Sequence, residues 1–178
     1  MNNDKYKKIG PGTLMWCSTK KAREGKYGNK YEASIVVDEK YAHTFNQQFH
    51  DSLSQFRSEK VAEFGDKFIE AFKIKWPFFE ELDKDGNKTG KWVARATARE
   101  FIEYDDIKQP NQPKVVDSEK KVIDTEVGNG SEGYIVVQCR PWALTIDAKT
   151  ISMPLWLDVV QVTNLVPFTG DSDPLDVL

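Results

Sequence analysis

Cationic side chains alternate with aromatic rings along several stretches of this sequence. Trp16 is followed by a cluster of lysine and arginine, and Arg95 and Arg99 precede Phe101. Lysine and arginine can neutralise phosphates, while flat rings can stack on unpaired bases without reading their sequence. This mixture therefore predicts binding of single-stranded nucleic acid. The residues predicted to bind it are Trp16, Lys20, Lys21, Arg23, Lys26, Tyr27, Lys30, Arg95, Arg99, Phe101, Tyr134, Arg140 and Trp142.

Any of these rings could instead belong to the hydrophobic core, because aromatic side chains bury large areas there. Three tryptophans are expected in the core: Trp76, Trp92 and Trp156. Four other rings remain open between binding and packing: Trp16, Phe101, Tyr134 and Trp142.

The sequence has no recognisable catalytic or metal-binding set. Neither the two histidines, His43 and His50, nor the two cysteines, Cys17 and Cys139, have the spacing of a zinc site. A phosphate-cradling glycine motif, a nucleophile elbow and an HExxH motif are all missing. We therefore expect no enzymatic activity, no catalytic residue, no metal and no cofactor. Both cysteines lie in apolar segments and are expected to be buried thiols in a reducing cytoplasm.

Charge is distributed unevenly along the chain. The 178 residues include 25 basic and 28 acidic ones, and three of the acids lie among the last eight residues. Residues 1–170 are therefore neutral, and the cation-rich stretch at 1–37 is either a local anion-binding surface or a chance variation of surface charge. We expect one domain at residues 1–170 and a flexible acidic tail at 171–178. No apolar run approaches a membrane helix, and the N-terminus lacks a signal core.

Residue alternation predicts a mainly β fold. The expected strands cover residues 13–21, 31–37, 91–101, 114–116, 133–140 and 150–167, the last one bent near Pro154. Along residues 91–101 alanines occupy one face, and two arginines and a phenylalanine occupy the other. Small side chains on the inside of a tightly curved sheet suit a small barrel that binds on its outer face.

One long helix is expected after the second strand. Apolar side chains recur every three to five residues from Glu39 to about Phe64, which is the stripe of a helix packed on a core. Asp38 can cap the start of this helix, and Gly65 can end it.

With these elements placed, the chain resembles the single-stranded DNA-binding proteins of short-tailed phage replisomes. Four stretches carry the resemblance, in the same order along the chain. They are YGNKYEASIV at 27–36, PFF at 77–79 followed by DGN at 85–87, VVDS at 115–118 followed by Lys121, Gly128, Gly130 and Ser131, and a final strand that leads into an acidic tail.

The resemblance implies an OB-like five-stranded antiparallel barrel with one long helix inserted after the second strand. It also implies a role in phage DNA replication, recombination and repair in the cytoplasm of the infected bacterial host, through contacts with phage DNA polymerase and primase-helicase. By position, Lys30 and Trp142 correspond to a cation and an aromatic residue of the family. A homodimer stays open. The predicted partner-binding tail residues are Asp171, Asp173, Asp176 and Leu178, and Leu178 stands where the family commonly has phenylalanine.

Two functions from different classes follow from this sequence. The favoured one is a non-enzymatic protein that binds single strands by stacking and charge. The rival is a protein-interaction adaptor on the same barrel, whose cation-rich front would bind acidic partners instead of nucleic acid.

Overall fold

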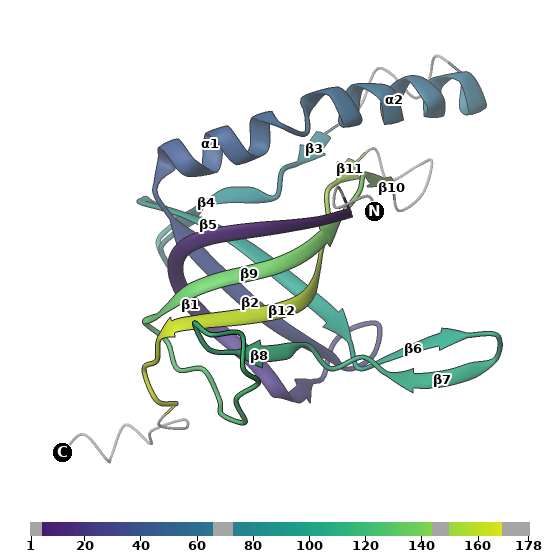
Figure 1. Ribbon diagram of the computed structural model, residues 1–178. Helices are drawn as coiled ribbons and strands as arrows, with labels where there is room; N and C mark the ends of the chain where they lie inside the picture. The colour runs from purple at the N-terminus through teal and green to yellow at the C-terminus, as the bar shows by residue number, and fades with distance from the viewer. Residues whose placement is uncertain (1–4, 66–72, 144–149, 169–178) are drawn as a thin grey trace.

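A computed structural model of the chain describes residues 5–65, 73–143 and 150–168, with residues 142 and 143 described by their backbone alone (Figure 1). The predicted acidic tail at 171–178 lies outside the described residues. The helices are α1 (Glu39–Gln47) and α2 (His50–Phe64). The strands are β1 (Tyr6–Arg23), β2 (Lys30–Val37), β3 (Lys73–Lys75), β4 (Phe78–Leu82), β5 (Lys88–Arg99), β6 (Phe101–Tyr104), β7 (Ile107–Pro110), β8 (Lys114–Val116), β9 (Ser131–Cys139), β10 (Trp142–Ala143), β11 (Thr150–Ser152) and β12 (Leu155–Asn164).

Five of these strands follow one another around a barrel, in the order β5, β2, β1, β9 and β12. Each is antiparallel to the next. A short parallel pairing then joins β12 to β5, where Leu155 lies opposite Ala96 and Trp156 opposite Thr97. The predicted mainly β, OB-like barrel is confirmed, and this parallel seam is a feature that the antiparallel prediction did not contain. Strands β10, β11 and β3 form a small separate sheet.

The alternation that predicted β5 is reproduced in the barrel. Ala94, Ala96 and Ala98 are buried, whereas Arg95 and Arg99 are exposed on the outer face. Small alanines let the neighbouring strands curve closely around the core, because a larger side chain would hold the walls of so small a barrel apart. The same strand therefore contributes to the core and presents cations outward.

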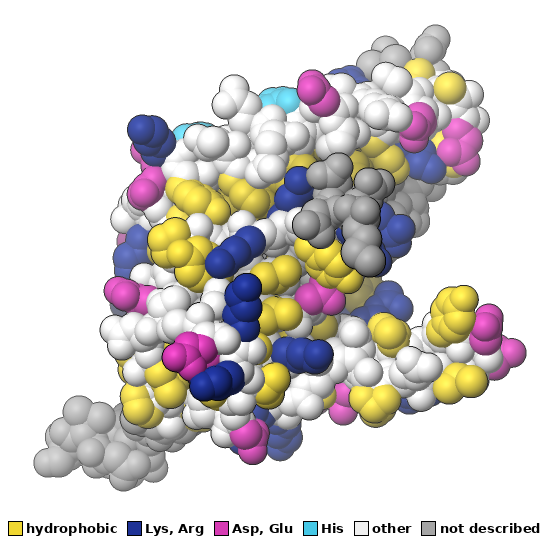
Figure 2. Space-filling view, in the orientation of Figure 1, with side chains coloured by type: hydrophobic (Ala, Val, Ile, Leu, Met, Phe, Trp, Pro, Cys, Tyr) yellow, Lys and Arg dark blue, Asp and Glu magenta, His cyan; other side chains and the backbone are white. Residues whose placement is uncertain are grey.

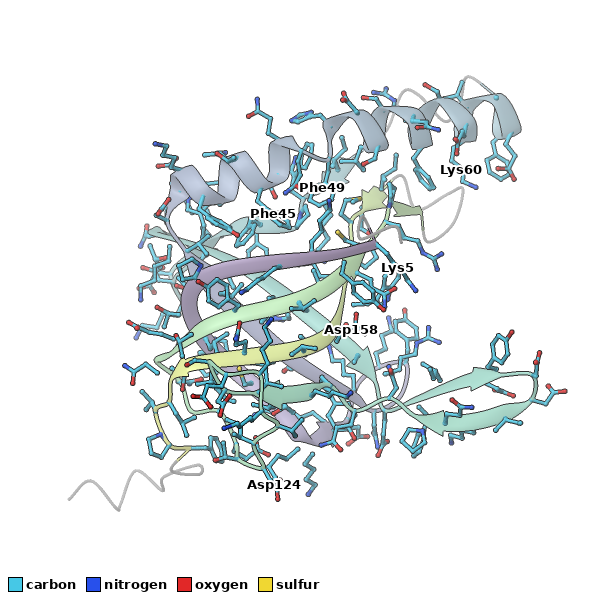
Figure 3. All side chains as sticks on the ribbon, viewed as in Figure 1. Lys5, Phe45, Phe49, Lys60, Asp124 and Asp158 are labelled. Atoms are coloured by element: carbon cyan, nitrogen blue, oxygen red, sulfur yellow. The ribbon has the colours of Figure 1, made fainter. Side chains whose placement is uncertain are left out.

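The helical segment lies where it was predicted, but it is divided into two helices instead of one. Asp38 caps α1, accepting a hydrogen bond from the backbone N–H of Tyr41 at 2.8 Å, and Gly65 ends α2 with φ +86°. Phe45 and Phe49 are buried against the barrel, as the apolar stripe predicted (Figure 3). Both helices cross one side of the barrel (Figure 1).

The predicted core positions of Trp76 and Trp92 are confirmed, since both are partly buried and packed on the core. The ring of His50 lies 4.8 Å from that of Trp76, and the ring of His43 lies 4.6 Å from that of Trp92. Within the described ranges, no three histidine, cysteine, aspartate or glutamate side chains gather as a metal site. No helix in the described part of the chain is long and apolar enough to cross a membrane.

A two-stranded arm, β6 with β7, follows β5 in place of the continuation of that strand to residue 101. The strand prediction through residue 101 was therefore wrong, because β5 ends at Arg99 and Phe101 begins the arm. Asp105 and Asp106 have φ of +49° and +62°, the two left-handed residues that a tight hairpin turn requires. Aspartate tolerates this conformation better than most residues do, which allows the turn without glycine. The arm projects away from the barrel (Figure 1).

Candidate nucleic-acid interface

A cleft of about 980 Å³ lies where β5, β9 and β12 meet the base of the β6–β7 arm. The surface is hollowed on the side from which the arm projects, and hydrophobic and cationic side chains border the hollow (Figure 2). Lys5 and Asp158 both lie at this cleft (Figure 3). The other side chains that bear on its chemistry are Arg99, Ile102, Asn111, Gln138, Cys139, Arg140 and Trp156.

Trp156 supplies the aromatic surface of the cleft, so the prediction that it belongs to the core was wrong. Its side chain is half-buried, between the buried Leu155 and Leu157. The guanidinium carbon of Arg140 lies 5.0 Å from the centre of the indole, within the range of a cation–π contact. Strand alternation could have identified this position, because Trp156 shares its parity with the polar Asp158 and not with the leucines.

Cations from three neighbouring strands converge beside the cleft. Lys30 of β2 pairs with Arg99 of β5 on one side and with Arg23 of β1 on the other. Glu32 partly neutralises this row, since its carboxylate lies 3.7 Å from Lys30 Nζ and 4.0 Å from Arg23 Nη1. Among the described residues, no ion pair is formed by Arg99 or Arg140. Those two guanidinium groups are therefore free to bind an anionic ligand.

The base of the arm forms a smaller hollow of about 280 Å³ that shares Arg99 and Ile102 with the cleft. Here Lys108 Nζ lies 4.4 Å from the centre of the Phe101 ring. Asn111 fixes the base of the arm, because its side-chain amide donates to the carbonyl oxygen of Arg99 at 3.1 Å. Phe101 is thus held next to Arg99, as the sequence spacing suggested, although the chain bends between them.

One acid lies among the described residues that line the cleft. Asp158 accepts a hydrogen bond from the side-chain amide of Gln138 at 3.0 Å. The same lining contains three cations, Lys5, Arg99 and Arg140, so the described lining carries a net positive charge. An anion that enters the cleft would meet three cations, one of which, Arg140, lies over the Trp156 ring.

Several predicted binding residues lie away from the cleft. Trp16, half-exposed and with φ +52°, lies at the opposite end of β9, where its backbone N–H donates to Asn129 Oδ1 at 2.7 Å. Lys20 forms an ion pair with Asp124 at 2.9 Å. Tyr134 lies on β9, and the ammonium group of Lys8, on β1, lies over its ring. Also outside the cleft lining are Lys21, Lys26 and the highly exposed Tyr27, together with Arg95 on the outer face of β5. The same holds for Arg23 and Lys30, in the row beside the cleft, and for Phe101, at the smaller hollow. Of the predicted residues, the described lining therefore contains Arg99 and Arg140. The Trp142 side chain lies outside what is described.

Both cysteines are free thiols. Cys17 is buried as expected, whereas Cys139 is only partly buried and gives the cleft a chemical probe. Burial raises the pKa of Cys139 to about 11 and that of Cys17 to about 12. At pH 8 about 0.1% of Cys139 should therefore be thiolate, compared with about a tenth of a thiol whose pKa has the unshifted value of 9.0, and its alkylation should be about a hundredfold slower. The rate should rise tenfold per pH unit until pH approaches about 11. Iodoacetamide labelling followed by mass spectrometry measures the alkylation rate. Labelling of Cys139 as fast as an ordinary exposed cysteine would contradict the prediction.

No family model and no curated protein matches this chain. Solved structures do match it. The gp2.5 single-stranded DNA-binding protein of bacteriophage T7 aligns over 97% of this chain and 92% of its own, with a TM-score of 0.66 and 18% identity. The single-stranded DNA-binding protein of bacteriophage Enc34, in complex with single-stranded DNA, aligns over 94% and 91%, with a TM-score of 0.57 and 12% identity. Its C-terminal truncation aligns with a TM-score of 0.58 over 93% of this chain and 90% of its own, at 12% identity. The chain therefore has the fold of these phage single-stranded DNA-binding proteins.

Proposed function

We propose that this protein binds single-stranded DNA, without sequence preference, in the cleft between β5, β9 and β12. The observation that carries the proposal is the half-buried ring of Trp156 under Arg140, with Arg99 lining the same cleft. OB folds bind oligonucleotides on the face of their second and third barrel strands and at the loop between the fourth and fifth. In this chain those strands are β2 and β5, and that loop begins at Arg140. The likeness to two phage proteins that bind single strands supports the same conclusion.

The binding mechanism follows from the chemistry of this lining. Phosphates would contact Arg99, Arg140 and Lys5, and a base would stack on Trp156. Every base offers a flat face, so stacking tolerates any sequence. With the three cations on phosphates, the side chains left to hydrogen-bond to a base edge in the described lining are the amides of Asn111 and Gln138 and the carboxylate of Asp158. The side chain of Gln138 is already engaged by Asp158, which leaves little capacity to read sequence.

A titration of fluorescent oligo-dT at several salt concentrations tests the proposal. Each phosphate contacted on a single strand contributes about −0.7 to the slope of log affinity against log salt. We expect a slope of about −2 to −3, because three or four cations border the cleft. Oligo-dT paired with oligo-dA should bind more weakly, since paired bases cannot stack on Trp156.

Preference for the duplex, or the absence of salt-dependent binding to oligo-dT, would contradict the proposal. The second result would favour the rival protein-interaction adaptor, for which the cation row at Arg23, Lys30 and Arg99 would serve an acidic partner. The oligo-dT titration therefore distinguishes the two functions.

We further propose that binding serves phage DNA replication, recombination and repair in the cytoplasm of the infected bacterial host, with no chemical step of its own. Phage DNA polymerase and primase-helicase are the proposed partners, and association of two copies is part of the proposal. The acidic tail at 171–178 would contact these partners through Asp171, Asp173, Asp176 and Leu178. A tethered acidic segment would also compete weakly with DNA for the cationic cleft.

A further inference from the structure

A second set of rings and cations lies outside the cleft, on the outer face of β1 and β9. Tyr6 and Lys8 of β1 face outward, and Tyr134 lies on the outer face of β9. Lys8 Nζ is 3.9 Å from the centre of the Tyr134 ring, and Lys5 Nζ is 5.6 Å from that of Tyr6. We call Tyr6, Lys8 and Tyr134 the β1–β9 track. A lysine ammonium group lies near each of the two rings. Surfaces that bind single strands combine rings and cations in the same way.

The track is continuous with the cleft. Tyr6 pairs across the strands with Gln138, whose side chain lines the cleft, and Lys8 pairs with Val136. The outward residues of β9, which ends one residue before Arg140, therefore connect the cleft to Tyr134. Six residues of extended strand separate those two positions, or about 20 Å at ~3.3 Å per residue. That length is several nucleotides, so a short strand bound in the cleft would not reach Tyr134.

The ring of Tyr134 is held in a fixed position. Its Cδ1 atom packs close to Gly10, where an added Cβ atom would be 2.9 Å from it. The exposed, flexible Lys8 side chain covers one face of the ring. A base could replace the ammonium group on that face, and Lys8 could then contact the adjacent phosphate. The ring is thus preorganised to stack, and its cation is already beside it.

We propose that the β1–β9 track binds the single strand as it leaves the cleft, and so lengthens the binding site beyond the cleft itself. The inference rests on the proposed function, because it assumes that the cleft binds DNA. It assigns a role to Tyr134, which the cleft does not contain, and to Tyr6 and Lys8, which the sequence pattern did not single out. Asp158 lines the cleft on β12, which neighbours β9 on the side away from β1, so the phosphates would pass on the side of Lys5 and Lys8.

The length of the oligonucleotide separates the track from the cleft. OB folds cover about 4–16 nucleotides, so oligo-dT of about 5 and about 15 nucleotides should probe the cleft alone and the cleft with the track. The double variant Lys8→Ala, Tyr134→Ala should bind the longer strand about tenfold more weakly and the shorter strand as the wild type does. Lys84→Ala is the charge control, because it removes one exposed lysine from the β4–β5 turn.

Equal affinities of wild type and double variant for the longer strand would overturn the proposal. Loss of affinity for both lengths would also overturn it, since the residues would then act on the cleft. The single variant Lys8→Glu changes only an exposed side chain, and it decides the matter if the double variant does not fold. Failure of the wild type to bind the shorter strand would instead contradict the proposed function.

Discussion

The double variant Arg99→Glu, Arg140→Glu should lose at least a hundredfold in affinity for oligo-dT while remaining folded. Hydrogen bonds to charged groups contribute about 1.5–3 kcal/mol each, so two lost phosphate contacts cost about 3–6 kcal/mol. Each 1.4 kcal/mol is a factor of ten in affinity. The new carboxylate at position 140 also lies beside Trp156, because Arg140 lies over its ring. Fluorescence anisotropy with labelled oligo-dT measures the loss.

Stability should be unaffected, because the Arg99 and Arg140 side chains are exposed and form no ion pair among the described residues. Circular dichroism melting checks this. The matched control is Lys84→Glu with Lys91→Glu, which changes the net charge equally but far from the cleft on the β4–β5 hairpin. If the control loses as much affinity as the cleft variant, binding depends on overall charge and not on this site.

Gly133→Ala should destabilise the barrel by about 3 kcal/mol, at the upper end of the cost of overpacking. Gly133 lies in β9 between β1 and β12, opposite Gly12 on one side and Val162 on the other. A methyl group at this position would overlap the backbone carbonyl oxygen of Gln161. Backbone atoms in a paired strand cannot move aside as a flexible side chain can, so the strands must separate. Urea unfolding measures the shift in the midpoint.

Gly90→Ala is the comparison for this experiment. Gly90 has φ +77° but has open space where a Cβ atom would lie, so it reports the cost of backbone conformation alone. That cost is about 1–2 kcal/mol. If Gly133→Ala is no more destabilising than Gly90→Ala, then β9 and β12 are not as close as the structure has them.

The periodic pattern of residues within a strand or helix was sufficient to predict which of its side chains are buried. Alternation along β5 correctly separated the buried alanines from the exposed Arg95 and Arg99, and the apolar stripe correctly placed Phe45 and Phe49 on the core. Both signals are periodic, and each residue's environment follows from its neighbours in the same element. The N-cap at Asp38 and the helix end at Gly65 were correct for the same reason.

The composition of the cleft could not be predicted in this way, because it depends on which strands are neighbours. Trp156 was assigned to the core from its apolar surroundings, yet the parallel seam of β12 with β5 brings it beside the outer face that carries Arg99. The arm was missed because its turn uses two aspartates at positive φ and no glycine. Trp16 and Arg99 look equivalent in sequence, because each lies on a strand among cations. The pairing of β1 with both β2 and β9 places Trp16 away from the cleft that Arg99 lines.

The central claim is that a single strand lies on Trp156, and photocrosslinking tests it directly. An oligo-dT of about 5 nucleotides with one 5-iododeoxyuridine would be irradiated in complex with the wild-type protein, and the adduct would be mapped by mass spectrometry. We expect the adduct on Trp156, whose ring lines the cleft under Arg140. Adducts on Trp16 or Tyr27, with Trp156 unmodified, would contradict the account and place the DNA on the other exposed rings of the barrel.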